Sequence, residues 1–121
     1  MDVKLKKQIE KLAKHNRRMY AAEFEHAEKT GVRHFPNKKY FKELKKQKKL
    51  LASMRASELR PILHALYAVS DELTRPKQLK PSFIDRASKE EAVEMMLSMR
   101  YLHEFLDEIL EKDIGGGPDT L

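Results

Sequence analysis

Lysine side chains recur at helical spacing between residues 38 and 49. Six of them are one, three or four residues apart: Lys38, Lys39, Lys42, Lys45, Lys46 and Lys49. At about 100° per residue they share an arc of roughly 120° on a helix, opposite the apolar Leu44 and Leu51. Ammonium groups along roughly 16 Å of helix axis can follow several phosphates of a polyanion, and release of the phosphate counterions would drive binding.

A second basic row precedes this one, in a segment without glycine or proline. It lies within about 40° of one line along a helix, and its members are Lys4, Lys7, Lys11, Lys14 and Arg18. Two interpretations stay open for both rows, a solvated face that keeps the protein soluble or a binding surface. Six like charges repel within about three turns, with Glu43 alone to offset them, and this cost in helix stability favours a binding surface.

Lysine rather than arginine dominates the second helix, and this composition bears on the kind of partner. Lysine is a point charge suited to phosphates, whereas base reading favours the bidentate fork of arginine. We therefore expect a nucleic acid, DNA or RNA, bound with little sequence specificity. His34, Phe35 and Tyr40 could stack on single-stranded bases. Phe41 is expected in the core, and so is Tyr40 in the alternative interpretation.

Catalytic constellations are sparse in this chain. Glu23 and His26 have the Glu-x-x-His spacing of di-iron bundles, but the second such motif that the site needs is absent. His64 is expected to be a hydrogen-bonded core residue. The glycine run Gly115–Gly117 lacks the lysine and the following helix of a phosphate loop. We expect a protein that is not an enzyme and that uses neither a metal nor a cofactor.

The charge of the chain is unevenly distributed along its 121 residues. Lysine and arginine total 25 against 19 acidic residues, a formal net charge of +6. Residues 1–60 carry 18 basic and 7 acidic side chains, a net charge of +11, whereas residues 61–121 carry 7 and 12, a net charge of −5. Such asymmetry indicates a basic functional face in the first half and an extended anionic partner.

Several classes of protein are disfavoured by what the composition lacks. With 0 cysteines, the chain has no disulfide framework and no thiolate zinc site. No apolar run approaches the roughly 18 residues that span a bilayer, and the first residues lack the apolar region of a signal peptide. The expectation is a soluble, cytoplasmic protein without a membrane partner.

The elements that must position the two rows are predicted to be helices. Periodicity and capping residues predict an all-α fold, a four-helix, mainly antiparallel bundle with a long N-terminal helix. Asn37 is expected to cap the second helix, Ser57 the third, and Ser88 with Glu91 forms a capping box for the last. The predicted ranges are helices at about 2–29, 38–56, 58–74 and 89–112, one domain over 1–112, and a flexible tail over 113–121.

The apolar positions say how the later elements are expected to pack. Leu66 and Leu73 belong to the buried stripe predicted for the third helix. The connection over 75–87, with two prolines, is expected to pack Phe83 and Ile84 back on the body. The last helix is apolar around much of its circumference, which indicates a central place in the core or a surface shared between subunits.

A second class of function follows from the last helix. Methionine adapts to many surfaces, so Met95, Met96 and Met99 could serve an interface, although core filling is the commoner use. The alternative is therefore a protein interaction module: an adaptor, an assembly factor or an inhibitor of an acidic partner, which docks through its basic face or associates through the last helix.

Two short segments resemble a known family. Residues 57–60 (Ser-Glu-Leu-Arg), which open an apolar helix after a lysine-rich one, are similar to part of the small all-helical subunit of type III CRISPR effector complexes. Residues 99–102 (Met-Arg-Tyr-Leu) in the last helix are similar as well. The resemblance implies a subunit that lines a nucleic-acid-bearing filament through a basic face, and it adds this role to the alternative class.

Overall fold

The computed structural model describes residues 2–31 and 37–112, and these residues form six helices without a strand. The expected all-α class is confirmed, whereas the four-helix bundle is not. In chain order, the helices are α1 (Val3–Thr30), α2 (Lys38–Ser53), α3 (Ala56–Val69), α4 (Pro81–Ile84), α5 (Lys89–Leu97) and α6 (Leu102–Lys112).

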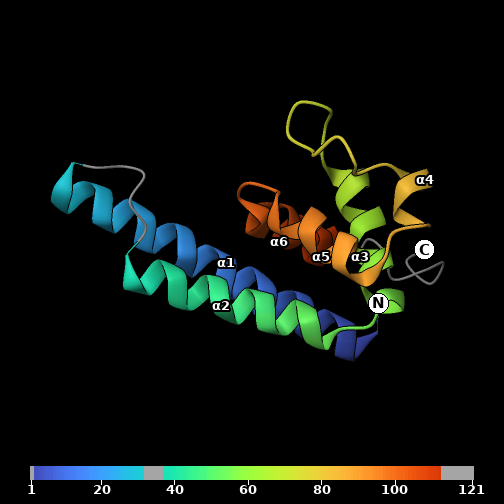
Figure 1. Cartoon of the computed structure of the whole chain (residues 1–121), viewed down its shortest axis with the longest axis horizontal. Helices are drawn as coiled ribbons and strands as arrows, with labels where there is room; N and C mark the ends of the chain where they lie inside the picture. Colours follow the sequence, from blue (N-terminus) through green and yellow to red (C-terminus); the bar gives the residue numbers. More distant parts are fainter. Residues whose placement is uncertain (1, 32–36, 113–121) are drawn as a thin grey trace.

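The two long helices α1 and α2 run side by side in opposite directions and form one flank of the molecule (Figure 1). Gly31 ends α1 in the left-handed conformation (φ 71°), which glycine adopts without a steric penalty. Asn37 caps α2 as expected, because its Oδ1 accepts a hydrogen bond from Tyr40 N (2.9 Å). Its Nδ2 donates to Ala22 O (3.0 Å), which ties the start of α2 to α1.

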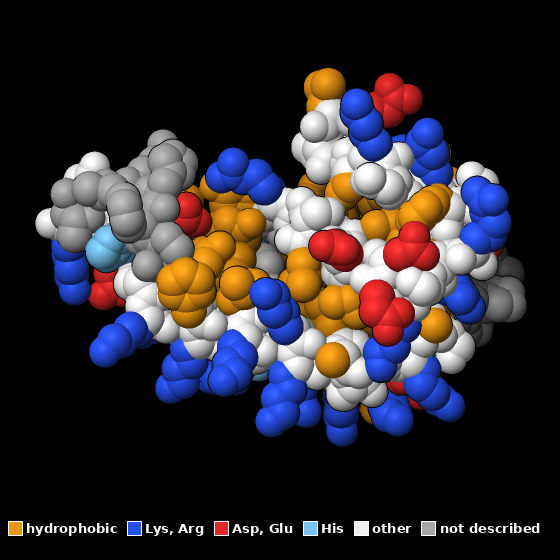
Figure 2. All heavy atoms as spheres, in the orientation of Figure 1, with side chains coloured by type: hydrophobic (Ala, Val, Ile, Leu, Met, Phe, Trp, Pro, Cys, Tyr) orange, Lys and Arg blue, Asp and Glu red, His pale blue; other side chains and the backbone are white. Residues whose placement is uncertain are grey.

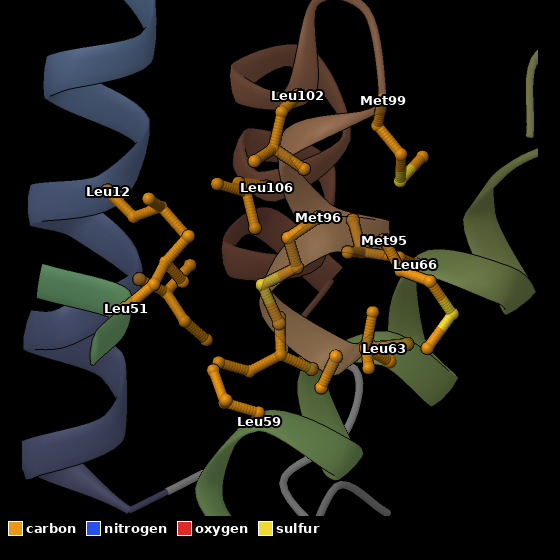
Figure 3. Close-up of a cluster of buried hydrophobic side chains, with 14 of the residues drawn as sticks. Leu12, Leu51, Leu59, Leu63, Leu66, Met95, Met96, Met99, Leu102 and Leu106 are labelled. Atoms are coloured by element: carbon orange, nitrogen blue, oxygen red, sulfur yellow. The ribbon is translucent and has the colours of Figure 1, made fainter. Parts of the chain in front are cut away.

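The hydrophobic core lies between this flank and the three helices α3, α5 and α6 (Figure 3). Leu12 of α1 and Leu51 of α2 meet the side chains of the other helices there, and both are almost fully buried. Ile84 is fully buried and Phe83 packs against the core, so the connection over 75–87 does pack on the body, and it contains the short helix α4. The labelled core residues of the later helices and of the break between α5 and α6, where Met99 lies, are Leu59, Leu63, Leu66, Met95, Met96, Met99, Leu102 and Leu106.

The predicted bounds of the third helix were wrong at both ends. Arg55, not Ser57, precedes the helix, and Arg55 N donates to Glu58 Oε1 (2.9 Å). The helix ends at Val69 because Asp71 Oδ1 accepts hydrogen bonds from Leu73 N (2.9 Å) and the next amide, which holds the chain in a turn. Leu73 is therefore 97% exposed rather than part of a buried stripe.

The predicted last helix, 89–112, is two helices in the structure. The capping box of Ser88 and Glu91 is confirmed at the start of α5, but the chain breaks after Leu97 and resumes at Leu102. Between them Tyr101 has a positive φ of 54°, and its amide donates to the Tyr20 hydroxyl of α1 (3.1 Å). The break lets the apolar residues of α5 and α6 reach one core from two directions, which a straight helix cannot do.

Two further expectations concern segments outside the described residues. The loop over 32–36, with the stacking candidates His34 and Phe35, is one of them, and the tail over 113–121 is the other. Within the described residues, α2 ends at Ser53, three residues earlier than predicted.

Candidate nucleic-acid interface

The predicted row on α1 is a set of exposed cations. Four of its members extend over three turns: Lys7, Lys11, Lys14 and Arg18. All four are exposed, and none has a carboxylate within 4.0 Å among the described residues. The opposite side of the helix is buried, with Ile9 and Leu12 each 1% exposed. Local periodicity therefore placed this row correctly on the surface.

The predicted row on α2 divides into two kinds of lysine. Lys38, Lys42, Lys45 and Lys49 are exposed and lie within 4.0 Å of no carboxylate in the part of the chain that the structure describes. Lys39 Nζ is 3.7 Å from Glu25 Oε2, across to α1. Lys46 Nζ is 3.4 Å from Glu43 Oε1, and Glu43 itself is buried. Two of the six predicted lysines thus have part of their charge compensated.

Contacts between α1 and α2 fix which residues of the two rows lie at the same level along the helices. Antiparallel contacts set the register: His15 meets Glu43, and Asn16 meets Gln47. In this register Lys11 lies roughly opposite Lys49, and Arg18 roughly opposite Lys42.

A shallow groove lies between α1 and α2. It is lined by residues of both helices: Arg18, Ala21, Ala22, Glu25, Lys39 and Glu43. Figure 2 shows Lys and Arg side chains along the lower edge of the molecule, the side on which α1 and α2 lie. We call eight exposed cations of the two rows, none of them within 4.0 Å of a carboxylate among the described residues, the basic face: Lys7, Lys11, Lys14, Arg18, Lys38, Lys42, Lys45 and Lys49.

A buried carboxylate lies beneath the basic face. His15 Nδ1 of α1 donates to Glu43 Oε2 of α2 (2.8 Å), and Lys46 contacts the other oxygen. Burial alone would raise the pKa of Glu43, but the hydrogen bond from His15 and the charge of Lys46 together lower it below its usual value of 4.5. Glu43 is therefore ionised at neutral pH and links the two helices. Apart from Lys46, it does not compensate the charges of the exposed lysines of α2.

This carboxylate predicts an acid dependence of stability. Because the pKa of Glu43 is lowered in the folded state, its contribution is complete well above pH 4.5 and is lost as the pH falls through the folded value. Chemical denaturation of the wild type and of Glu43→Gln at several pH values checks this. We expect the stability difference between the two proteins to shrink below pH 4.5, and a difference that stays constant down to pH 3 would contradict it.

A buried amide pair lies next to the carboxylate and holds the basic helices to the body. Asn16 is 3% exposed, and its Nδ2 donates to Gln47 Oε1 of α2 (3.0 Å). Its Oδ1 accepts from both the amide (3.0 Å) and the Nδ1 (2.8 Å) of His103 in α6. Burial, followed by the charge of Arg17, lowers the pKa of His103, so the imidazole is neutral at pH 7. One side chain of α1 thus fixes both α2 and α6.

Phe41 was expected in the core, and that expectation was wrong. Its side chain is 56% exposed beside the lysines of α2. Tyr40 is half-buried, and its ring meets the Phe41 ring edge-on at a centroid distance of 5.7 Å. The helical pattern placed Phe41 on the apolar side of α2, where it borders the exposed lysines of the same helix.

The catalytic candidates do not come together. His64 is hydrogen-bonded, with Nε2 donating to Asp85 Oδ1 (2.8 Å), but its side chain is 39% exposed rather than in the core. Over residues 2–31 and 37–112, no three His, Cys, Asp or Glu side chains are grouped so that they could hold a metal ion. Within the same ranges, no helix has both the length and the apolar character to cross a membrane.

The methionines of the interaction-module alternative are core residues in this chain. Met95, Met96 and Met99 are exposed by 5%, 0% and 2%. All three belong to the buried core cluster shown in Figure 3. Their adaptable side chains fill the chain's own interior, which was the commoner of the two expected uses.

Comparison with known proteins found no matching family model, no matching curated protein and no matching solved structure.

Proposed function

We propose that the protein binds nucleic acid, without catalysis, through the phosphates that its basic face can reach. The observation that carries the proposal is the charge of this face: eight exposed cations on two packed helices, with no carboxylate within 4.0 Å of any of them in the described residues. Like charges at this density repel, so the face costs folding free energy that binding to a polyanion would recover.

The composition of the basic face supports weak sequence specificity. Arg18 is its one arginine, and the other seven members are lysines, whose compact charge suits phosphate oxygens better than base edges. Each row extends for roughly 16 Å along its helix, from Lys7 to Arg18 and from Lys38 to Lys49. A backbone with regularly spaced phosphates matches such a row.

The salt dependence of binding tests the proposal. If about six to eight phosphates are neutralised, the log–log slope of affinity against salt should lie between about −5 and −7 for duplex DNA. The measurement is a mobility shift or fluorescence anisotropy titration at several salt concentrations, with DNA and RNA of unrelated sequences. Absence of binding to all of them at low salt would contradict the proposal.

An acidic protein is the alternative partner for the same face. This second class includes an adaptor, an inhibitor or a helical subunit of a nucleoprotein complex, and charge complementarity supports it equally. Competition separates the two: a polyglutamate chain should displace bound nucleic acid only weakly, because its charges do not match the phosphate spacing. Binding to polyglutamate with the same affinity and salt slope would favour an acidic protein.

A further inference from the structure

An exposed aromatic side chain lies at the edge of the basic face. Phe41 is three residues after Lys38 and four before Lys45, so all three lie on neighbouring positions of the α2 surface. A single exposed apolar side chain is common on protein surfaces, but Phe41 is 56% exposed between a row of lysines and an apolar groove. This position suits a ligand that presents phosphates and an apolar planar surface together.

A groove beyond Phe41 offers room for such a surface. It runs between α2 and α5, with a volume of about 750 Å³, and its apolar lining includes Tyr40, Leu44, Val93 and Leu97. Lys48 and Lys89 line it as well, together with Glu90 and Glu94. Figure 2 shows hydrophobic side chains gathered above the row of lysines on the face in view.

We infer that the basic face takes a single-stranded nucleic acid, whose phosphates follow the lysines of α2 and whose bases stack on Phe41 and enter the α2–α5 groove. The inference rests on the proposed function and specifies its ligand. Duplexes keep their bases stacked inside, so they could use the lysines but not the aromatic side chain. Unpaired bases have free faces, and aromatic side chains beside a cationic track are the usual way of binding them.

Charge complementarity favours a single-stranded nucleic acid over an apolar peptide helix as the ligand. The lysines beside Phe41, namely Lys38, Lys42 and Lys45, have no carboxylate within 4.0 Å among the residues described, so a polyanionic strand would neutralise them. The acidic members of the groove, Glu90 and Glu94, lie on α5, the side away from this row. The ligand is therefore anionic along α2 and apolar within the groove.

The test compares three ligands of equal length: oligothymidylate, oligouridylate and a DNA duplex. For Phe41→Leu, we expect about tenfold weaker binding of both single strands, which is the order that one base–aromatic stack supplies. Duplex affinity and the salt slope should stay unchanged, because Phe41→Leu removes no cation. Phe41→Tyr keeps an aromatic face and should bind single strands like the wild type. The matched control is Leu73→Ala, which shortens another exposed apolar side chain (97% exposed) far along the chain from the basic face.

The outcomes separate this inference from the proposed function. A loss confined to single strands and restored by Phe41→Tyr supports it, and the two single-stranded arms then report whether RNA or DNA is preferred. Equal losses on single strands and duplex, or no loss on either, would overturn it while the basic face stands. If the wild type binds none of the three ligands at low salt, the proposed function itself is wrong. Binding of an acidic amphipathic peptide that depends on Phe41, without binding of any strand, would also overturn it.

Discussion

Replacing Lys42, Lys45 and Lys49 together with Glu should weaken nucleic-acid binding by about three orders of magnitude at 0.1 M salt. Each lost phosphate contact costs nearly one power of ten at that salt concentration, because fewer counterions are released. The three new carboxylates repel the phosphates in addition. The slope of log affinity against log salt should become shallower by about three. Anisotropy titrations of wild type and variant at several salt concentrations measure both quantities.

The choice of these three lysines follows from their surroundings. All three are exposed and within 4.0 Å of no carboxylate among the described residues, so their removal should leave the free energy of unfolding nearly unchanged. Lys46 is not suitable, although it belongs to the same row. Its Nζ is 3.4 Å from Glu43 Oε1, and a glutamate there would face a buried carboxylate. A triple variant with Lys46 would confuse loss of binding with loss of stability.

A matched control keeps the same change in net charge away from the basic face. Lys6, Lys77 and Lys80 are exposed, and their replacement with Glu also lowers the net charge by six. Lys77 and Lys80 lie in the connection before α4, and Lys6 lies on the side of α1 away from the row. If this control loses as much affinity as the first variant, binding depends on total charge and the basic face has no special role.

The sequence alone could predict the positions of the two rows but not all of their partners. Exposed lysines follow the helical period because the opposite side of each helix must be buried, and that rule is local. Whether a lysine is compensated depends on which residue of another helix lies next to it. Glu25 meets Lys39, and Glu43 turns inward to His15, only because α1 and α2 pack in one particular register.

The remaining errors have the same origin in tertiary packing. Phe41 has the helical period of a core residue and is nevertheless 56% exposed, because periodicity along α2 cannot say how much of its apolar side another helix covers. The chain between Leu97 and Leu102 contains neither glycine nor proline, and local propensity favours one continuous helix there. The Tyr20 hydroxyl on α1 accepts a hydrogen bond from the Tyr101 amide, and the two rings stack. These contacts stabilise a break that the residues next to it do not predict.

The replacement Asn16→Ala should destabilise the protein by about 3 kcal/mol, because buried groups that lose their partners pay the full cost of desolvation. It removes the acceptor of two His103 donors and the donor to Gln47 Oε1, in a place where Asn16 and Gln47 are 3% and 1% exposed. For a chain of this size, the melting temperature should fall by about 10 °C. Thermal and chemical denaturation measure the change.

The neighbouring residue supplies the control for this variant. Arg17 also joins α1 to α6, through a salt bridge to Asp107, but its side chain is 52% exposed. Solvent screens such a pair, so Arg17→Ala should cost less than about 1 kcal/mol. Equal losses of stability in the two variants would mean that the buried amide network stabilises the fold no more than the exposed salt bridge does.

The same variant also shows what the basic face needs from the rest of the fold. Its eight cations lie on α1 and α2, so at a temperature where Asn16→Ala is fully folded its nucleic-acid affinity should equal that of the wild type. If affinity falls together with stability, α6 must fix the spacing of the two rows through Asn16. The affinity of Asn16→Ala is measured at low temperature and again near its unfolding transition. The two values show whether α1 and α2 alone present the basic face, or whether their contacts with α6 are required.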